Sequence, residues 1–204
     1  MHIAIVGNIG AGKTTLTELI AHHLNFEAQF EAVEDNPYLE DFYADMKRWA
    51  FNLQIFFLNS RFRHIVELQN RSINMVQDRT IYEDAYIFAE NLYDMGLMSA
   101  RDFENYSNIF QSILHYIKAP DLLIYLRASV PTLVSNIQKR GRDYESGIRL
   151  DYLSKLNEKY EKWISNYNDG KLLILDKDNL DFANKPEDLG YIIQKIEGEM
   201  FGLF

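Results

Sequence analysis

The chain has 204 residues, which suits a single α/β domain over 1–204 with a sizeable hydrophobic core. It contains no cysteine, so disulfides, thiolate metal sites and cysteine nucleophiles are excluded, and its formal net charge of -9 argues against binding a nucleic-acid polymer. The start of the chain lacks a signal-peptide pattern, and no apolar run approaches the roughly 18 residues of a membrane span. We therefore expect a cytoplasmic protein without membrane contact.

The strongest pattern lies at the N-terminus. Residues 3–6 form an apolar run, typical of a strand buried on both faces of a parallel sheet, and a helix with one apolar face is expected after the following loop. Between them, residues 7–14 match G-x-x-x-x-G-K-[ST] at every position, which predicts that the loop binds a nucleoside triphosphate while Thr14 holds Mg²⁺. The predicted nucleotide-binding residues are Gly7, Asn8, Ile9, Gly10, Ala11, Gly12, Lys13, Thr14 and Thr15.

Acids at two further strand ends are candidates for the chemistry. A short strand at 27–33 contains Glu31, which would lie near the phosphate loop and could accept a proton from a reacting hydroxyl, although a solvated strand-end acid explains it as well. A strand at 73–77 runs into Asp78, a candidate for Mg²⁺, and Arg79, a candidate for binding a transferring phosphoryl oxygen. Strand ends are also often charged for solubility alone.

A helix rich in aromatic residues is predicted from 43 to about 68. Gln54 and Arg61 lie about 20° apart on one face of such a helix. Tyr43 falls on that face too, unless it belongs to the turn before the helix. The polar line is explained equally well by binding and by a solvated stripe.

The second half of the chain alternates helices and strands. The segment of about 138–147, with Arg140 and Arg142 around Gly141, is predicted to be a lid over phosphates, with an ordinary basic helix end as the alternative. Five apolar strands, each followed by a helix, predict an open parallel sheet with helices on both faces and ligands at the carboxyl ends of the strands. The elements expected here are helices at 86–95, 101–118, 131–140, 150–167 and 187–199, and strands at 122–126 and 172–175.

Three classes of phosphate-loop protein compete. A GTP-binding switch needs N-K-x-D, and the nearest match, at 184–187, lacks the Asp. A nucleoside monophosphate kinase needs early arginines for the acceptor phosphate, but no Lys or Arg occurs between Lys13 and Lys47. A kinase that acts on a neutral hydroxyl needs a carboxylate instead, and Glu31 fits.

In this last class, the sequence resembles the deoxyribonucleoside kinases of the deoxycytidine, deoxyguanosine and deoxyadenosine type over nearly the whole chain. Two positions depart from the family pattern: Ala32 stands where Pro is frequent, and Asn136 stands where a further lid arginine can occur. The motifs that carry the resemblance are the phosphate loop, Glu31-Ala-Val33, Tyr43-x4-Arg48-Trp49, Phe51-x2-Gln54, Arg61, Asp78-Arg79-Thr80 with Asp84, and Lys139-Arg-Gly-Arg142-x2-Glu145.

The resemblance implies a P-loop kinase fold with an arginine-containing lid and transfer of phosphate from ATP, with Mg²⁺, to the 5′-hydroxyl of a deoxyribonucleoside in nucleotide salvage. It also implies a homodimer, and relatives of this kind are inhibited by the end-product triphosphate. The implied site residues are Glu31 as general base, Arg79 and Lys13 at the reacting phosphate, Asp78 near Mg²⁺, Tyr43 and Glu145 at the sugar 3′-hydroxyl, Gln54, Arg61 and Asp84 at the base, Arg140 and Arg142 in the lid, and Asp181 and Phe182 in the loop around the adenine of ATP.

Base preference follows from hydrogen-bonding chemistry. Gln54 can pair with the N6/N7 edge of adenine, and Asp84, held by Arg61, can accept from an exocyclic amine that thymine lacks. Adenine, guanine and cytosine stay open, with deoxyadenosine first. A thymidylate-like monophosphate kinase and a nucleotide sensor without catalysis are the alternative functions.

Overall fold

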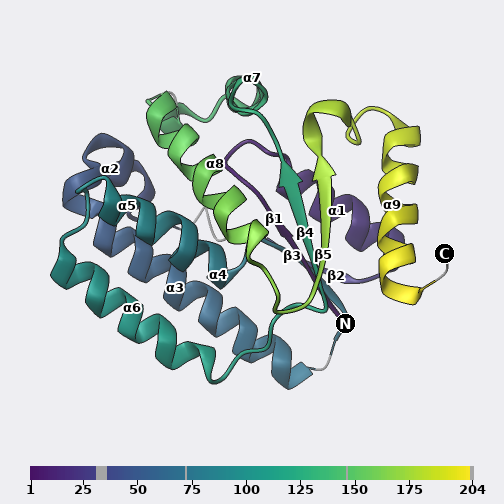
Figure 1. Ribbon diagram of the computed structural model, residues 1–204, viewed down its shortest axis with the longest axis horizontal. Coiled ribbons are helices and arrows are strands. Elements are labelled where there is room, and N and C mark those ends of the chain that lie inside the picture. Colours follow the sequence, from purple (N-terminus) through teal and green to yellow (C-terminus); the bar gives the residue numbers. More distant parts are fainter. Residues whose placement is uncertain (31–35, 72, 146, 203–204) are drawn as a thin grey trace.

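The computed structural model describes residues 1–30, 36–71, 73–145 and 147–202. Within them a parallel sheet of five strands has the order β2-β3-β1-β4-β5, so the strand that enters the phosphate loop lies at its centre (Figure 1). This confirms the predicted open parallel sheet. The strands are β1 (His2–Val6), β2 (Glu27–Gln29), β3 (Met75–Asp78), β4 (Leu122–Arg127) and β5 (Lys171–Asp176).

Helices cover both faces of the sheet (Figure 1). Successive side chains of a strand point to opposite faces, so Ala4 and Val6 join one apolar cluster while Ile3 and Ile5 join the other. The first cluster packs against α3 (Met46–Arg71), α6 (Ala100–Leu114) and α8 (Leu150–Ser165), and the second against α1 (Lys13–Leu24) and α9 (Pro186–Phe201). The remaining helices are α2 (Leu39–Ala44), α4 (Ile81–Glu83), α5 (Glu90–Asp94) and α7 (Val130–Arg140).

The structure decides the alternative left open for Tyr43. The chain breaks at Asp45, which has φ -145° and ψ 83°, and the long helix begins only at Met46. Tyr43 therefore belongs to the separate helix α2, and its place on the face of Gln54 and Arg61 was a wrong prediction.

The helix predicted at 86–95 begins earlier, at Ile81. Thr80 and Glu83 form a capping box in which each side chain binds the other residue's backbone N–H, and this fixes the start of α4. A π-helical segment, Asp84–Ala89, then joins α4 to α5. Other bounds also differ by a few residues from the predicted ones; for example, α6 ends at Leu114 and β3 begins at Met75. The described part of the second strand is Glu27–Gln29.

Among the described residues, no helix combines the length and apolar character needed to cross a membrane. They also contain no cluster of three or more His, Cys, Asp or Glu side chains arranged to hold a metal ion.

Candidate active site

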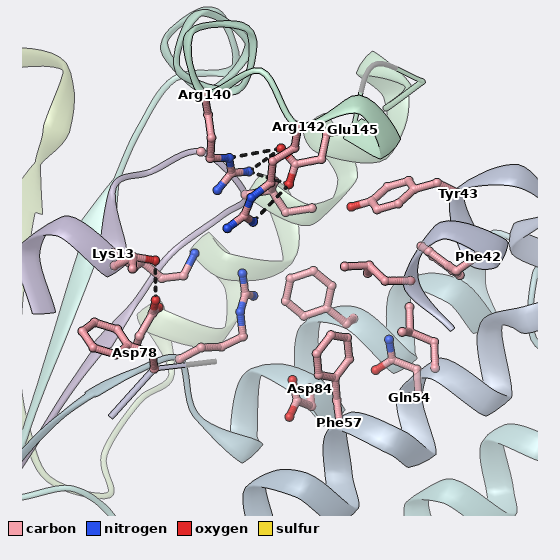
Figure 2. Close-up of a pocket in the computed structure, with 18 of the residues that line it drawn as sticks. Lys13, Phe42, Tyr43, Gln54, Phe57, Asp78, Asp84, Arg140, Arg142 and Glu145 are labelled. Atoms are coloured by element: carbon pink, nitrogen blue, oxygen red, sulfur yellow. Dashed lines mark hydrogen bonds and ion pairs between the residues drawn. The ribbon is translucent and has the colours of Figure 1, made fainter. Parts of the chain in front are cut away.

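A cavity of about 540 Å³ opens at the carboxyl ends of β1 and β3 (Figure 2). It brings together most of the predicted site residues, from the phosphate loop, α2, α3, the end of β3 and the lid. Glu31 lies outside the described residues. The predicted residues that do not line the cavity are Gly7, Asn8, Ala11, Gly12, Thr15, Arg61, Asp181 and Phe182. The predicted residues that do line it are Ile9, Gly10, Lys13, Thr14, Tyr43, Gln54, Asp78, Arg79, Asp84, Arg140, Arg142 and Glu145.

The phosphate loop is packed so closely that its glycines leave no space for a side chain. A Cβ on Gly7 would meet the carbonyl oxygen of Leu126 at 2.8 Å, and one on Gly10 would meet that of Leu133 at 2.7 Å. Gly10 also has φ +83°, which L-residues rarely adopt. The loop therefore has the close backbone cradle that a phosphate group requires, followed by the N-terminus of α1.

Asp78 and Thr14 form the oxygen-rich floor of this end of the cavity. The Thr14 hydroxyl donates to Asp78 Oδ2 at 2.5 Å. Asp78 is only 3% exposed, and its other oxygen, Oδ1, has no hydrogen-bond partner among the described residues. Mg²⁺ prefers hard oxygen ligands of this kind, so the residues present fit the predicted ion.

Arg79 has an unusual backbone and a well-packed side chain. Its φ is +69°, one of two positive values among the described non-glycine residues. The guanidinium lies over the ring of Phe88 at 4.4 Å, and its Nη1 is 3.3 Å from the Tyr160 hydroxyl and 3.7 Å from Glu83 Oε1. These contacts hold the guanidinium at the cavity wall.

Glu83 and Tyr160 were given no role by the sequence reasoning, although both are completely buried at this site. Glu83 had a detectable signal, because the spacing Thr80-x-x-Glu83 before an apolar run is that of a capping box. Tyr160 had none, since it is one more aromatic residue on the apolar face of α8.

The opposite end of the cavity contains the predicted base-reading residues. Arg61 Nε contacts Asp84 Oδ2 in a buried ion pair, which confirms the expected pairing of these two residues. Arg61 also donates to the carbonyl oxygen of Arg79 at 3.3 Å, so it lies behind the cavity wall and holds Asp84 from there. Gln54 is 2% exposed, and its Oε1 has no hydrogen-bond partner among the described residues. Burial and the nearby Asp84 raise the pKa of Tyr106, whose hydroxyl therefore stays protonated.

The lid arginines contact Glu145 (Figure 2). Arg140 Nη2 lies 2.6 Å from both carboxylate oxygens, and Arg142 Nη1 lies 3.7 Å from Oε1. Asn136, which replaces a possible third lid arginine, donates from Nδ2 to the carbonyl oxygen of Gly10 at 2.9 Å. That position therefore supports the phosphate loop.

The loop predicted to surround adenine lies on the outer side of the phosphate loop. Phe182 is buried beside Gly12, where an added Cβ would be 3.2 Å from its ring. Asp181 donates its backbone N–H to Asp188 at 2.7 Å and accepts from Asn184 at 2.9 Å, so it fixes the start of α9.

Comparison with known proteins identifies the family. The sequence profile described as deoxynucleoside kinase matches residues 3–200. The chain belongs to the deoxynucleoside kinase family. It is therefore a phosphotransferase, and the resemblance drawn from the motifs is confirmed.

Named relatives agree on the reaction but differ in the base. Deoxyadenosine/deoxycytidine kinase of Bacillus subtilis is 38% identical over 196 residues, covering 95% of this chain and 90% of the relative. Deoxyguanosine kinase of Lactobacillus acidophilus is 35% identical over 203 residues, covering 95% and 88%. The structure of deoxyadenosine kinase from M. mycoides with products dCMP and a flexible dCDP bound has a TM-score of 0.85 and 33% identity, covering 97% of this chain and 100% of that chain. The M. mycoides enzyme has also been solved with bound dATP.

Proposed function

We propose that this kinase transfers the γ-phosphoryl group of ATP to the 5′-hydroxyl of a deoxyribonucleoside, deoxyadenosine first, in cytoplasmic nucleotide salvage. The observation that supports this most directly is that the phosphate loop and the Gln54–Asp84 end share one cavity of about 540 Å³. That volume lies in the range of small-molecule sites.

The proposed reaction is a direct phosphoryl transfer. The 5′-oxygen bonds to the γ-phosphorus, the bond from that phosphorus to the bridging oxygen of ADP breaks, and the hydroxyl proton passes to Glu31. Lys13 and the loop amides bind the donor phosphates, while the Arg79 guanidinium stabilises the transferring group. Mg²⁺, held by Thr14 and Asp78, would neutralise phosphate charge when bound.

The proposed base preference depends on unsatisfied and paired polar groups. The unpartnered Gln54 oxygen accepts from the N6 amine of adenine while its amide group donates to N7. Asp84, fixed by Arg61, accepts from an exocyclic amine, so a pocket of this kind disfavours thymidine. Relatives are named for deoxyadenosine, deoxycytidine and deoxyguanosine, so the order rests on the hydrogen-bonding chemistry of Gln54 and Asp84.

The remaining roles complete the proposal. Tyr43 and Glu145 bind the sugar 3′-hydroxyl, which requires the lid at about 138–147 to transfer Arg140 and Arg142 from Glu145 to phosphate. Asp181 and Phe182 cradle the donor adenine.

We also propose a single domain, a homodimer through the aromatic helices, and inhibition by the end-product triphosphate. Sedimentation velocity tests the dimer, and inhibition by dATP that is competitive with both substrates tests the last point.

The test is a phosphorylation panel with purified protein, ATP and Mg²⁺. Deoxyadenosine, deoxyguanosine, deoxycytidine, thymidine and their 5′-monophosphates are compared by kcat/KM. Deoxyadenosine is expected to be turned over best, and Glu31→Gln to lower kcat by about 10²–10⁴. Glu31 loses its role if the folded variant turns over normally.

Two alternative functions predict different results in this phosphorylation panel. A thymidylate-like kinase phosphorylates only monophosphates, although the absence of Lys and Arg between Lys13 and Lys47 disfavours it. A nucleotide sensor binds ATP without turnover of any acceptor, so ATP binding together with no turnover across the whole panel would favour that class.

A further inference from the structure

A buried carboxylate links the phosphate loop to the end of β3. Glu83 is completely buried, and its Oε2 accepts the backbone N–H of Thr80 at 2.7 Å in the capping box. Its other oxygen, Oε1, accepts the backbone N–H of Gly7 at 3.2 Å and lies 3.7 Å from Arg79 Nη1. One side chain thus contacts the first residue of the loop and the guanidinium at the cavity wall.

Tyr160 closes the same network from α8. Its hydroxyl lies 2.6 Å from Glu83 Oε1 and 2.9 Å from the carbonyl oxygen of Gly7, and it accepts from Arg79 Nη1 at 3.3 Å. Burial and Glu83 raise the pKa of Tyr160 well above its usual value, so the hydroxyl keeps its proton for donation. Its ring stacks on Tyr125 with centroids 5.7 Å apart, which fixes the direction of the hydroxyl.

Stability alone is a weak explanation for this network. A buried ion pair is often replaced by packed apolar side chains at no cost or with a gain in stability, because desolvation offsets the attraction between the charges. The partners are also unequal in function: Gly7 begins the phosphate loop, whereas Arg79 comes from a neighbouring strand and lines the cavity. Phosphoryl transfer depends on the relative placement of these two parts.

We propose that Glu83 and Tyr160 are positioning residues for catalysis, which fix the Arg79 guanidinium relative to the first turn of the phosphate loop. This inference rests on the proposed role of Arg79 at the transferring phosphoryl group. Neither residue lines the cavity, so they act through Arg79 and Gly7 and not by contact with the substrate. The expected signature is a loss of kcat without a matching change in KM for the deoxynucleoside.

The first test is Tyr160→Phe, which removes the hydroxyl and keeps the stacked ring. A displacement of about 1 Å at a reacting centre can cost roughly 100-fold, so we expect kcat to fall by about 10- to 100-fold and KM for deoxyadenosine to change by less than about two-fold. The matched control is Tyr125→Phe, which removes a hydroxyl that donates to Glu161 at 3.0 Å from the adjacent stacked ring. This control is expected to keep the wild-type kcat.

Glu83→Gln provides the conservative substitution. Gln keeps one oxygen that can accept from the Thr80 N–H in the capping box, but its NH2 group replaces the oxygen that accepts from the Gly7 N–H and faces Arg79. We therefore expect Glu83→Gln to lower kcat although the capping box remains. Thermal unfolding of each variant identifies the folded fraction at the assay temperature. The proposal is overturned if kcat falls only in proportion to that fraction, or falls equally in Tyr125→Phe.

Arg79→Lys in the same assay separates this inference from the function on which it rests. If Arg79→Lys is impaired while folded Tyr160→Phe is not, positioning by Tyr160 is wrong and the role of Arg79 stands. If Arg79→Lys is fully active, the proposed role of Arg79 itself fails. Positioning through Arg79 further predicts that the double variant loses less than the product of the two single losses.

Discussion

The two ends of the cavity are built differently. At the phosphate end, the loop glycines pack against backbone carbonyls of β4 and α7, and Glu83 and Tyr160 tie the loop to the end of β3. At the base end, Gln54 is buried with an oxygen that has no partner among the described residues. In the proposed reaction the phosphate group is the same in every turnover, and the loop would bind it in a preformed cradle. The base would be the variable part, and a polar group that only the correct ligand satisfies would provide selectivity.

The largest effect is expected from Gly10→Ala, which distorts the phosphate loop. The new Cβ would meet a backbone carbonyl at 2.7 Å, and φ +83° strains any L-residue, so the loop must move. We expect kcat/KM for ATP to fall by at least about 100-fold. Gly96→Ala is the control, because it has a similar φ of +69° with no atom within 4 Å of the added Cβ. Equal losses in the two variants would assign the effect to backbone strain alone.

At the base end, Arg61→Met combined with Asp84→Ala should shift selectivity by about 100-fold toward thymidine, measured as the ratio of kcat/KM for deoxyadenosine and thymidine. Both changes are needed, because Asp84→Ala alone leaves the Arg61 charge buried without compensation, at a cost of about 3–5 kcal/mol. Removal of the exposed pair Arg127 and Glu161 serves as the control. An unchanged ratio in the double variant would place base recognition elsewhere.

A smaller effect is expected from Gln54→Leu, which should weaken substrate binding but increase the stability of the fold. KM for deoxyadenosine should rise about 10-fold, while the unfolding free energy increases by about 1 kcal/mol because an unsatisfied buried oxygen is removed. Asn91 also has a buried oxygen without a partner among the described residues, but it does not line the cavity. Asn91→Leu should therefore stabilise the protein with no change in KM. If KM for deoxyadenosine rises equally in Gln54→Leu and Asn91→Leu, repacking of the core, and not lost recognition of the base, weakens binding.

Much of the fold could be predicted from the sequence, but one helix boundary could not. Each of the five strands in the described residues overlaps a predicted one. The reason is clearest for β1 and β4, which are buried on both faces and contain uninterrupted apolar runs. The helix break at Asp45 was missed because neither Gly nor Pro marks it. Helical spacing could not place Tyr43, which the family motif alone assigned to the site and which lines the cavity from α2.

Site residues were predicted where a local motif marks them. The phosphate loop and Asp78 follow from the P-loop motif and from a strand end, and the cavity contains residues of both. The pairing of Arg61 with Asp84 was expected from the family resemblance, and the structure contains this ion pair. The hydrogen bond from Tyr160 to Gly7 spans 153 positions and joins residues of different elements, so the hydrophobic periodicity of the sequence does not predict it. The contacts of Arg140 and Arg142 with Glu145 span only five and three positions, but the sequence analysis assigned the arginines to phosphate and Glu145 to the sugar.

The π-helical segment Asp84–Ala89 has a consequence for how the family can vary in length. A π turn accommodates one residue more than an α turn, and one residue corresponds to about 100° of rotation around a helix axis. Deleting a single residue here would restore regular α geometry while the later side chains of the helix keep their directions, so that Leu92 stays buried and Tyr93 stays exposed. Descendants of this chain should therefore be able to lose one residue within this segment, whereas a one-residue deletion in a regular α-helix would turn the later side chains by about 100°.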